Sequence, residues 1–165
     1  MVSRFALVVL ACLAFAPAGA LAENTTAPAS ASVELVGAGP APVVLTAESL
    51  ASLPSVEKEV SFQTSKGPST GRYKGVLFWD VLQANKAFDG LERNGELKRT
   101  FLVDARDGYS IAFSVGEIHP DFGNTQLMLA TEVDGKPIQG GIRIVVPGDK
   151  RGARAIHDIV KIELR

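Results

Sequence analysis

The residues of this chain most suited to chemistry are cations gathered near its end. Lys150, Arg151 and Arg154 follow Pro147-Gly148, where an alternating apolar run stops, and His157 comes soon after. Backbone N–H groups at a glycine-bounded turn, together with ammonium and guanidinium groups, are typical of a site for an anion. The alternative is a solvated basic loop, because runs of charge are usually exposed faces. As residues that bind an anionic ligand we predict Gly148, Lys150, Arg151 and Arg154.

Another polar segment has a spacing that could bind a metal ion. Glu117, His119 and Asp121 follow an i, i+2, i+4 pattern, so on a strand their side chains would share one face. Pro120 interrupts a regular strand because it cannot complete the hydrogen-bond ladder. We therefore favour a polar loop over a metal site.

A serine hydrolase triad can be assembled from the residue types present. Ser61 or Ser114 would be the nucleophile, His157 the base and Asp158 the group that orients the base. We predict a strand over 156–164, and neighbouring side chains on a strand point to opposite faces. This expectation excludes His157 and Asp158 as a base and its orienting partner.

The first residues are typical of a cleaved export signal. Arg4 precedes an apolar run over 5–15 that is too short to span a bilayer, and Ala20-Leu21-Ala22 matches a cleavage site. We predict a signal peptide over 1–22, a mature chain that begins at Glu23, and a periplasmic or secreted protein. The alternative is lipid attachment at Cys12, which would put the protein on a membrane.

The composition of the mature chain limits its partners and its chemistry. Removing Arg4 from 17 basic residues leaves 16 against 18 acidic ones, a net charge of −2, which argues against nucleic acid and an anionic membrane surface as partners. The one cysteine, Cys12, leaves with the signal peptide. The mature chain therefore has no disulfide and no thiolate for catalysis or metal binding.

Periodicity and turn residues predict an α+β domain rich in strands. Segment 23–32 is predicted as a disordered spacer and 33–165 as a single domain. Asp107-Gly108 predicts a type I′ hairpin turn and Asp134-Gly135 a second hairpin, whereas the glycines and proline of 65–72 predict a loop. We expect short helices at 115–118, over 76–88, and from the N-cap Thr46 to 53. Strands are expected over 33–36, 42–45, 57–64, 99–105, 109–113, 126–133, 142–146 and 156–164, in a mixed, curved sheet.

Three segments, in order, resemble a known family. They are GRYKGVLFWDVL at 71–82, DGYSIAFSVGEI at 107–118 and VVPGDKRGARAIHDIVKIE at 145–163. Together they resemble the sulfite-oxidase-type oxidoreductase molybdopterin-binding domain, over about 45–165. The resemblance implies that family's fold, with molybdopterin as the suggested cofactor and oxidoreduction as the suggested activity.

The chain departs from that family where the cofactor chemistry resides. Catalytic members bind molybdenum through a cysteine on the strand before the first segment, and here 60–64 reads VSFQT. A family Lys or Arg that holds the cofactor's phosphate is matched by His157, which the resemblance implies as a fifth cofactor-binding residue. A tryptophan that often follows is matched by Asp158. The leader also lacks the twin-arginine pair that exports folded, cofactor-loaded proteins. These departures argue against molybdenum ligation.

We therefore expect a non-catalytic binding or accessory module of sulfite-oxidase-type fold. Its partner would be an anionic small molecule or a redox or sensory protein in the periplasm. The first alternative is a molybdopterin-dependent oxidoreductase, or a subunit of one, with a cysteine-free site. The second is a periplasmic protein-interaction domain. The residue pattern leaves the ligand and the cofactor open.

Overall fold

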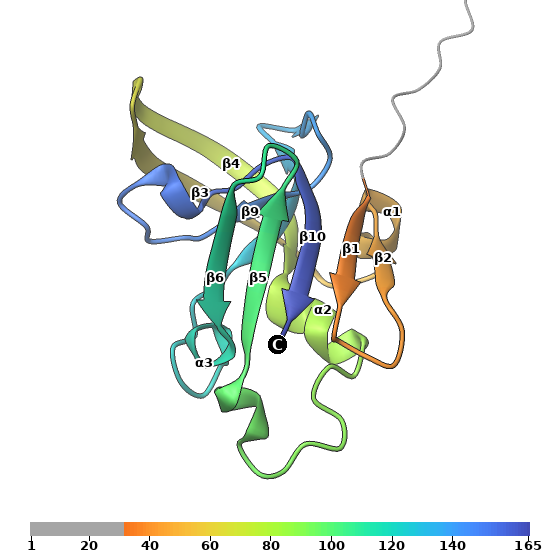
Figure 1. Ribbon diagram of the computed structural model, residues 1–165. Coiled ribbons are helices and arrows are strands. Elements are labelled where there is room, and N and C mark those ends of the chain that lie inside the picture. The colour runs from red at the N-terminus through yellow and green to blue at the C-terminus, as the bar shows by residue number, and fades with distance from the viewer. Residues whose placement is uncertain (1–31) are drawn as a thin grey trace, which may run out of the picture.

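Two five-stranded β-sheets and short helices make up residues 32–165, the part of the chain that the computed structural model describes. The predicted signal peptide and nearly all of the predicted spacer lie outside these residues. The helical elements are α1 (Ala47–Leu50), α2 (Phe78–Ala84), α3 (Val115–Ile118) and the 3₁₀ turns η1 (Gly95–Lys98) and η2 (Gly152–Arg154). The prediction of a strand-rich α+β structure with short helices is thus confirmed (Figure 1).

The strands form two sheets instead of the single mixed sheet that we expected. In one sheet the order is β2-β1-β10-β5-β6, with bounds Val43–Leu45, Val33–Val36, Ile159–Leu164, Thr100–Ala105 and Ser110–Ser114. This sheet is mixed because β1 and β10 run parallel. The other sheet is antiparallel and consists of β3 (Ser55–Thr64), β4 (Gly67–Leu77), β7 (Met128–Val133), β8 (Lys136–Pro137) and β9 (Arg143–Val145), where β7 pairs with β4, β8 and β9.

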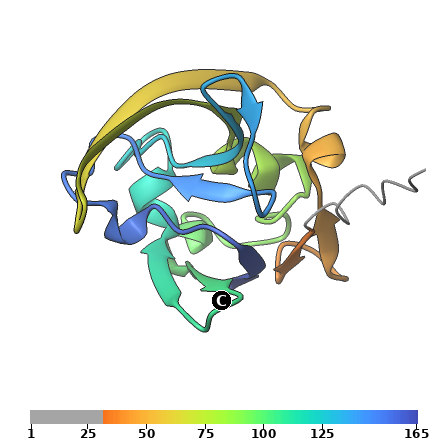
Figure 2. The same cartoon turned by 90° about the horizontal axis from the view of Figure 1, so that it is seen from above.

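The predicted loop over 65–72 is wrong, because most of it belongs to β4. Strands β3 and β4 pair along their whole length from Ser55 opposite Val76 to Thr64 opposite Gly67. Pro68 is tolerated because its pair, Gln63, donates its N–H to the Lys150 carbonyl (2.9 Å) on the far side of β3. The pair at Pro68 therefore needs no proline N–H. The result is a long curved hairpin that arches around one side of the molecule (Figures 1 and 2).

The two Asp-Gly hairpins have different turns. Asp134 (φ 51°) and Gly135 (φ 73°) are both left-handed between paired residues of β7 and β8, as a type I′ turn requires. In the other hairpin only Gly108 (φ 86°) is left-handed, and its N–H donates to the Ala105 carbonyl (3.1 Å). The type I′ prediction is wrong there: residues 106–109 form a longer loop between β5 and β6.

The helices are where we predicted them but are shorter. Thr46 caps α1 by accepting the Ser49 N–H (3.1 Å), although the helix ends at Leu50 and not at 53. The predicted helix over 76–88 loses its first two residues to β4 and ends at Ala84. Gly75 allows this strand to continue, because a Cβ there would lie 2.1 Å from the Leu129 carbonyl oxygen of β7.

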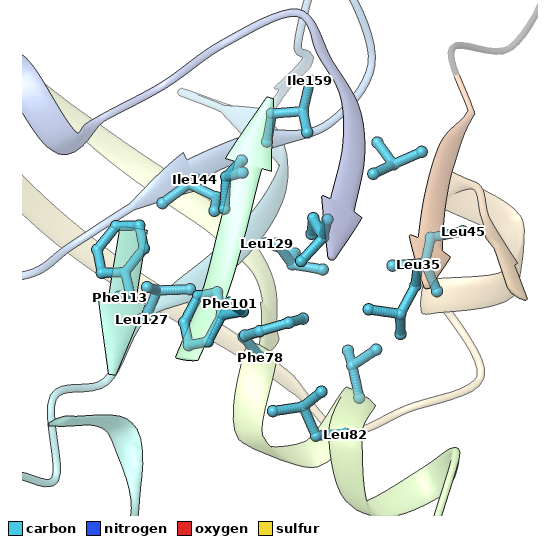
Figure 3. Packing of buried hydrophobic residues seen from close by; sticks show 14 of the residues in the cluster. Leu35, Leu45, Phe78, Leu82, Phe101, Phe113, Leu127, Leu129, Ile144 and Ile159 are labelled. Atoms are coloured by element: carbon cyan, nitrogen blue, oxygen red, sulfur yellow. The ribbon is translucent and has the colours of Figure 1, made fainter. Parts of the chain in front are cut away.

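Strands β7 and β9 separate two apolar clusters. Leu129 and Ile144 face the main core, where Phe78 of α2 meets Phe101 of β5 with ring centroids 4.7 Å apart (Figure 3). Alternate residues of the same strands face a smaller cluster beneath the long hairpin. That cluster consists of Val60, Phe62, Tyr73, Met128, Ala130, Val145 and Ala155. One face of β9 is therefore directed toward the long hairpin, where the candidate site lies.

Candidate functional site

A cavity of about 690 Å³ lies between the end of β3 in one sheet and the β5–β6 loop of the other, beside the smaller cluster. Its wall comes from the end of β3, the β5–β6 loop, β9 and the segment 151–157 that contains η2. Figures 1 and 2 both show this segment beside the tip of the long hairpin. The wall therefore joins elements that are far apart in the sequence.

Three contacts, from two sides, hold segment 151–157 in place. Gln63 of β3 and Arg151 form an isolated parallel bridge, and Gly152 packs so closely on the Phe62 ring that a Cβ would approach it to 2.7 Å. From the other side, the Tyr109 hydroxyl of the β5–β6 loop donates to the Ala153 carbonyl (3.1 Å). The cavity wall is thus braced on both sides.

Arg143, which we did not predict as a site residue, is the most distinctive side chain in the wall. Its guanidinium carbon lies 5.6 Å from the ring centroids of both Phe62 and Tyr73, and its Nη2 donates to the Ala155 carbonyl (3.3 Å). The Nε is buried and has no hydrogen-bond partner within residues 32–165. The ion pairs formed in this part of the chain do not include Arg143. A buried donor without a partner costs free energy, so it is an unusual feature that needs an explanation.

The strand pattern explains how Arg143 reaches the cavity. Its neighbours Ile142 and Ile144 are buried in the main core, so the alternation of β9 turns Arg143 and Val145 toward the long hairpin. A cation in the middle of an apolar alternating run is a signal that sequence analysis could have used, because Arg is rarely placed on a buried strand face without a partner.

The charges of the cavity wall favour an anion. Arg143 and Arg151 are cationic, His157 can be protonated, and Asp107 is the single carboxylate among the residues that line the cavity. Apolar groups are present as well, since the Phe62 ring and the half-exposed Tyr109 ring contribute to the wall. Such a mixture suits a small organic anion with a flat or apolar body.

The structure separates the five predicted ligand residues. Arg151 and His157 line the cavity, whereas Gly148, Lys150 and Arg154 are not part of its wall. Gly148 is left-handed (φ 93°), and both Gly148 and Lys150 are exposed. Whether any of the five binds a ligand stays a prediction.

Arg154 is held by two carboxylates. It makes a two-pronged contact with Asp149 (Nε–Oδ2 2.9 Å, Nη2–Oδ1 2.7 Å) and a third with Glu117 of α3 (Nη1–Oε1 2.5 Å). Its guanidinium also lies 5.3 Å from the centroid of the Phe113 ring. Hydrogen bonds to Asp149 and Glu117 raise the pKa of Arg154 despite its partial burial. These contacts connect residues 148–154, the basic turn, to α3.

The expectation about His157 and Asp158 is wrong. Strand β10 begins only at Ile159, and Asp158 is left-handed (φ 52°), so the two side chains do not alternate. Instead His157 Nδ1 lies 2.7 Å from Asp158 Oδ2. The candidate nucleophiles are elsewhere: Ser61 accepts a hydrogen bond from Thr70 (2.9 Å) and Ser114 caps α3, and neither lines the cavity.

Glu117, His119 and Asp121 do not converge on one point. Glu117 turns to Arg154, while His119 packs against Trp79 with ring centroids 4.5 Å apart and accepts the Asp121 N–H at Nδ1 (3.1 Å). No group of three or more His, Cys, Asp or Glu side chains in residues 32–165 is arranged to hold a metal ion. No helix in the same residues is long and apolar enough to cross a membrane.

The cavity fits part, but not all, of the cofactor that the family resemblance implies. The strand that should supply a thiolate is β3, where Val60 and Phe62 are packed in the smaller cluster. The cavity wall offers no sulfur atom, so its donors do not match a thiolate-bound molybdenum centre. The unpaired Nε of Arg143, in contrast, fits an anionic organic group.

Comparison with known proteins supports the fold and nothing finer. No protein-family model and no curated protein matches the chain. A chain from the crystal structure of the sulfane dehydrogenase SoxCD from Paracoccus pantotrophus superposes with a TM-score of 0.62 and 18% sequence identity. The match covers 81% of the present chain but only 37% of that chain. At this identity the likeness shows a distant relationship of fold.

Proposed function

We propose that the cavity binds a small organic anion and that Arg143 is its principal binding residue. The protein would be an exported binding or accessory module of sulfite-oxidase-type fold, without molybdenum catalysis. The likeness to part of a sulfane dehydrogenase supports the proposed fold family. The absence of a thiolate from the mature sequence argues against molybdenum ligation.

The observation that carries the proposal is the buried, unpaired Nε of Arg143 beside an open cavity. A carboxylate, sulfonate or phosphate can accept hydrogen bonds from a guanidinium in a two-pronged geometry. The rings of Phe62 and Tyr73 limit the movement of the guanidinium, so it is held ready for a ligand. Arg151, on the same wall, adds a second positive charge.

The likeness to SoxCD favours one further candidate function. A molybdopterin-dependent oxidoreductase, or a subunit of one, would use the same cavity for the organic part of its cofactor. Metal analysis of protein purified from the exported fraction separates the two candidates. Molybdenum at about one atom per chain would contradict the module that we propose.

Calorimetric titration with 4-nitrobenzenesulfonate tests the binding proposal. This probe combines a flat ring with an anion whose charge does not change between pH 5 and 9. We expect Arg143→Met to weaken binding at least about 10-fold, because a hydrogen bond to a charged group contributes about 1.5–3 kcal/mol. The matched control is Arg72→Met. Arg72 is an exposed arginine of β4 that pairs with Glu57 of β3 (3.5 Å), and it does not line the cavity. Equal losses in both variants, or binding that Arg143→Met leaves intact, would overturn the proposal.

A further inference from the structure

Besides Arg143, the cavity has a second distinctive feature, the contact between His157 and Asp158. His157 belongs to the cavity wall, and its side chain is 63% exposed. Its Nδ1 lies 2.7 Å from Asp158 Oδ2. A carboxylate at one ring nitrogen orients the imidazole and stabilises its protonated form, which leaves Nε2 to donate to a ligand.

The backbone around Asp158 is shaped to bring these two neighbours together. Asp158 adopts φ 52°, a left-handed conformation that costs free energy for a residue with a side chain. Its carbonyl accepts the Arg106 N–H (2.9 Å), which ties it to the β5–β6 loop. Its carboxylate lies against Gly140, where a Cβ would come within 2.0 Å of Oδ1. The carboxylate is therefore confined between Gly140 and His157.

We infer that His157, oriented by Asp158, is a proton-dependent binding residue of the cavity, so that the anion binds together with a proton. This inference rests on the proposed function and names the regulation of that site. An imidazole is the side chain whose charge changes between pH 5 and 8. The protein would thus hold an anion more tightly in an acidic compartment than in a neutral one.

The charges around His157 give the sign of the effect. The anionic groups near His157 are Asp158 beside it and Asp107 on the β5–β6 loop. The cations that share the cavity wall are Arg143 of β9 and Arg151 before η2. Arg106 contributes its backbone N–H to Asp158, and Tyr109 completes this side of the wall. A bound anion neutralises the two arginines, so binding raises the proton affinity of His157, and by linkage protonation tightens binding.

The test is calorimetric titration of the mature protein with 4-nitrobenzenesulfonate at pH 5.5 and pH 8.5. We expect about 10-fold tighter binding at pH 5.5, the typical effect of one charge-assisted hydrogen bond. His157→Gln should show no gain in affinity at pH 5.5 over pH 8.5. Because His157 is mostly exposed, this substitution leaves the fold intact. Asp158→Asn, which removes the carboxylate that orients the imidazole, should reduce the gain in affinity at pH 5.5.

The chain offers a matched control, since it contains two histidines. His119 packs on Trp79 and Phe122 and does not line the cavity, so His119→Gln should keep the wild-type pH dependence. Equal affinity at both pH values in the wild type, or an unchanged pH dependence in His157→Gln, would overturn the inference and leave the binding proposal standing. Failure of the probe to bind at either pH would overturn both.

Discussion

Two arginines, Arg143 and Arg154, show how the same side chain takes opposite roles on the two sides of one turn. Each guanidinium lies over aromatic rings, Arg143 over Phe62 and Tyr73 and Arg154 over Phe113. Arg154 is surrounded by two carboxylates, whereas Arg143 makes one hydrogen bond, to a backbone carbonyl, and keeps a buried Nε without a partner in residues 32–165. Arg154 stabilises the turn, whereas Arg143 is the side chain that we propose as a binding residue.

The difference arises from where each arginine lies in the fold. Asp149 is five residues before Arg154, so the turn itself supplies one partner, and α3 supplies Glu117 from 37 residues away. Arg143 stands on a strand whose opposite face is buried in the main core, and its own face meets aromatic rings and the cavity. Local charge pairing therefore satisfies Arg154, while the alternation of β9 places Arg143 where acidic partners are lacking.

The largest effect on stability is expected from Arg154→Ala. The change leaves Asp149 and Glu117 without the cation that both contact, and both side chains are more than two-thirds buried. Loss of a buried charge partner costs about 3–5 kcal/mol, and we reduce this to about 1–3 kcal/mol because Arg154 is one-third exposed. Urea denaturation measures the change in the free energy of unfolding.

Two further variants sharpen this first prediction. Arg154→Lys keeps the charge but not the two-pronged contact, so its loss should be intermediate. Arg151→Ala, in the same turn, should change stability by no more than about 0.5 kcal/mol, since the Arg151 side chain is exposed. If Arg151→Ala is as destabilising as Arg154→Ala, the two carboxylate contacts are not what makes Arg154 stabilising.

A smaller effect on stability is expected from Arg143→Met. The substitution removes two cation–π contacts, each worth about 0.5–1 kcal/mol, and one long hydrogen bond. It also removes the unpaired Nε, whose burial costs about 1–3 kcal/mol. The two contributions nearly offset each other, so the free energy of unfolding should stay within about 1 kcal/mol of the wild type. A loss as large as that of Arg154→Ala, again by urea denaturation, would mean that Arg143 is structural.

These two arginines also show what the sequence could predict and what it could not. The basic turn was recognised as a cluster of cations, but linear spacing does not reveal that Glu117 from α3 neutralises part of it. The position of Arg143 in an apolar alternating run is a usable signal, but its neighbours in sequence do not reveal which groups surround it. Its partners Phe62 and Tyr73 come from the hairpin that bends over β9.

The same limit applies to the backbone. Asp134-Gly135 has the turn that its residue types predict, because two left-handed residues match a two-residue hairpin. Gly67 and Pro68 predicted a loop, yet pairing along the whole of β3 draws them into a strand. Asp158 was expected on a regular strand, and its left-handed φ is tied to contacts with Arg106 and Gly140. At these positions the backbone conformation follows from contacts with distant segments and not from the local residue types.

The smallest effect is expected at Glu163, which mirrors Arg154 as an anion between two cations. It accepts hydrogen bonds from Lys161 (2.8 Å) and from Arg165 (3.0 and 3.1 Å), both on the outer face at the end of β10. These hydrogen bonds lower the pKa of Glu163 from 4.5 to about 2. Because the folded-state pKa is depressed, the stabilising contribution is complete above pH 4.5 and is lost as the pH falls toward 2.

Glu163→Gln should therefore abolish one component of acid destabilisation and do little else. Its two partners, Lys161 and Arg165, are each two residues away along the chain, so the network joins no distant elements, in contrast with the link from Arg154 to α3. We expect the melting temperature of the variant to fall less steeply than that of the wild type between pH 4.5 and 2, and to differ less from it at pH 7 than that of Arg154→Ala does. An acid transition identical to that of the wild type would show that the pKa of Glu163 is the same in the folded and the unfolded chain. A loss at pH 7 equal to that of Arg154→Ala would show that connection between distant elements is not what distinguishes the two networks.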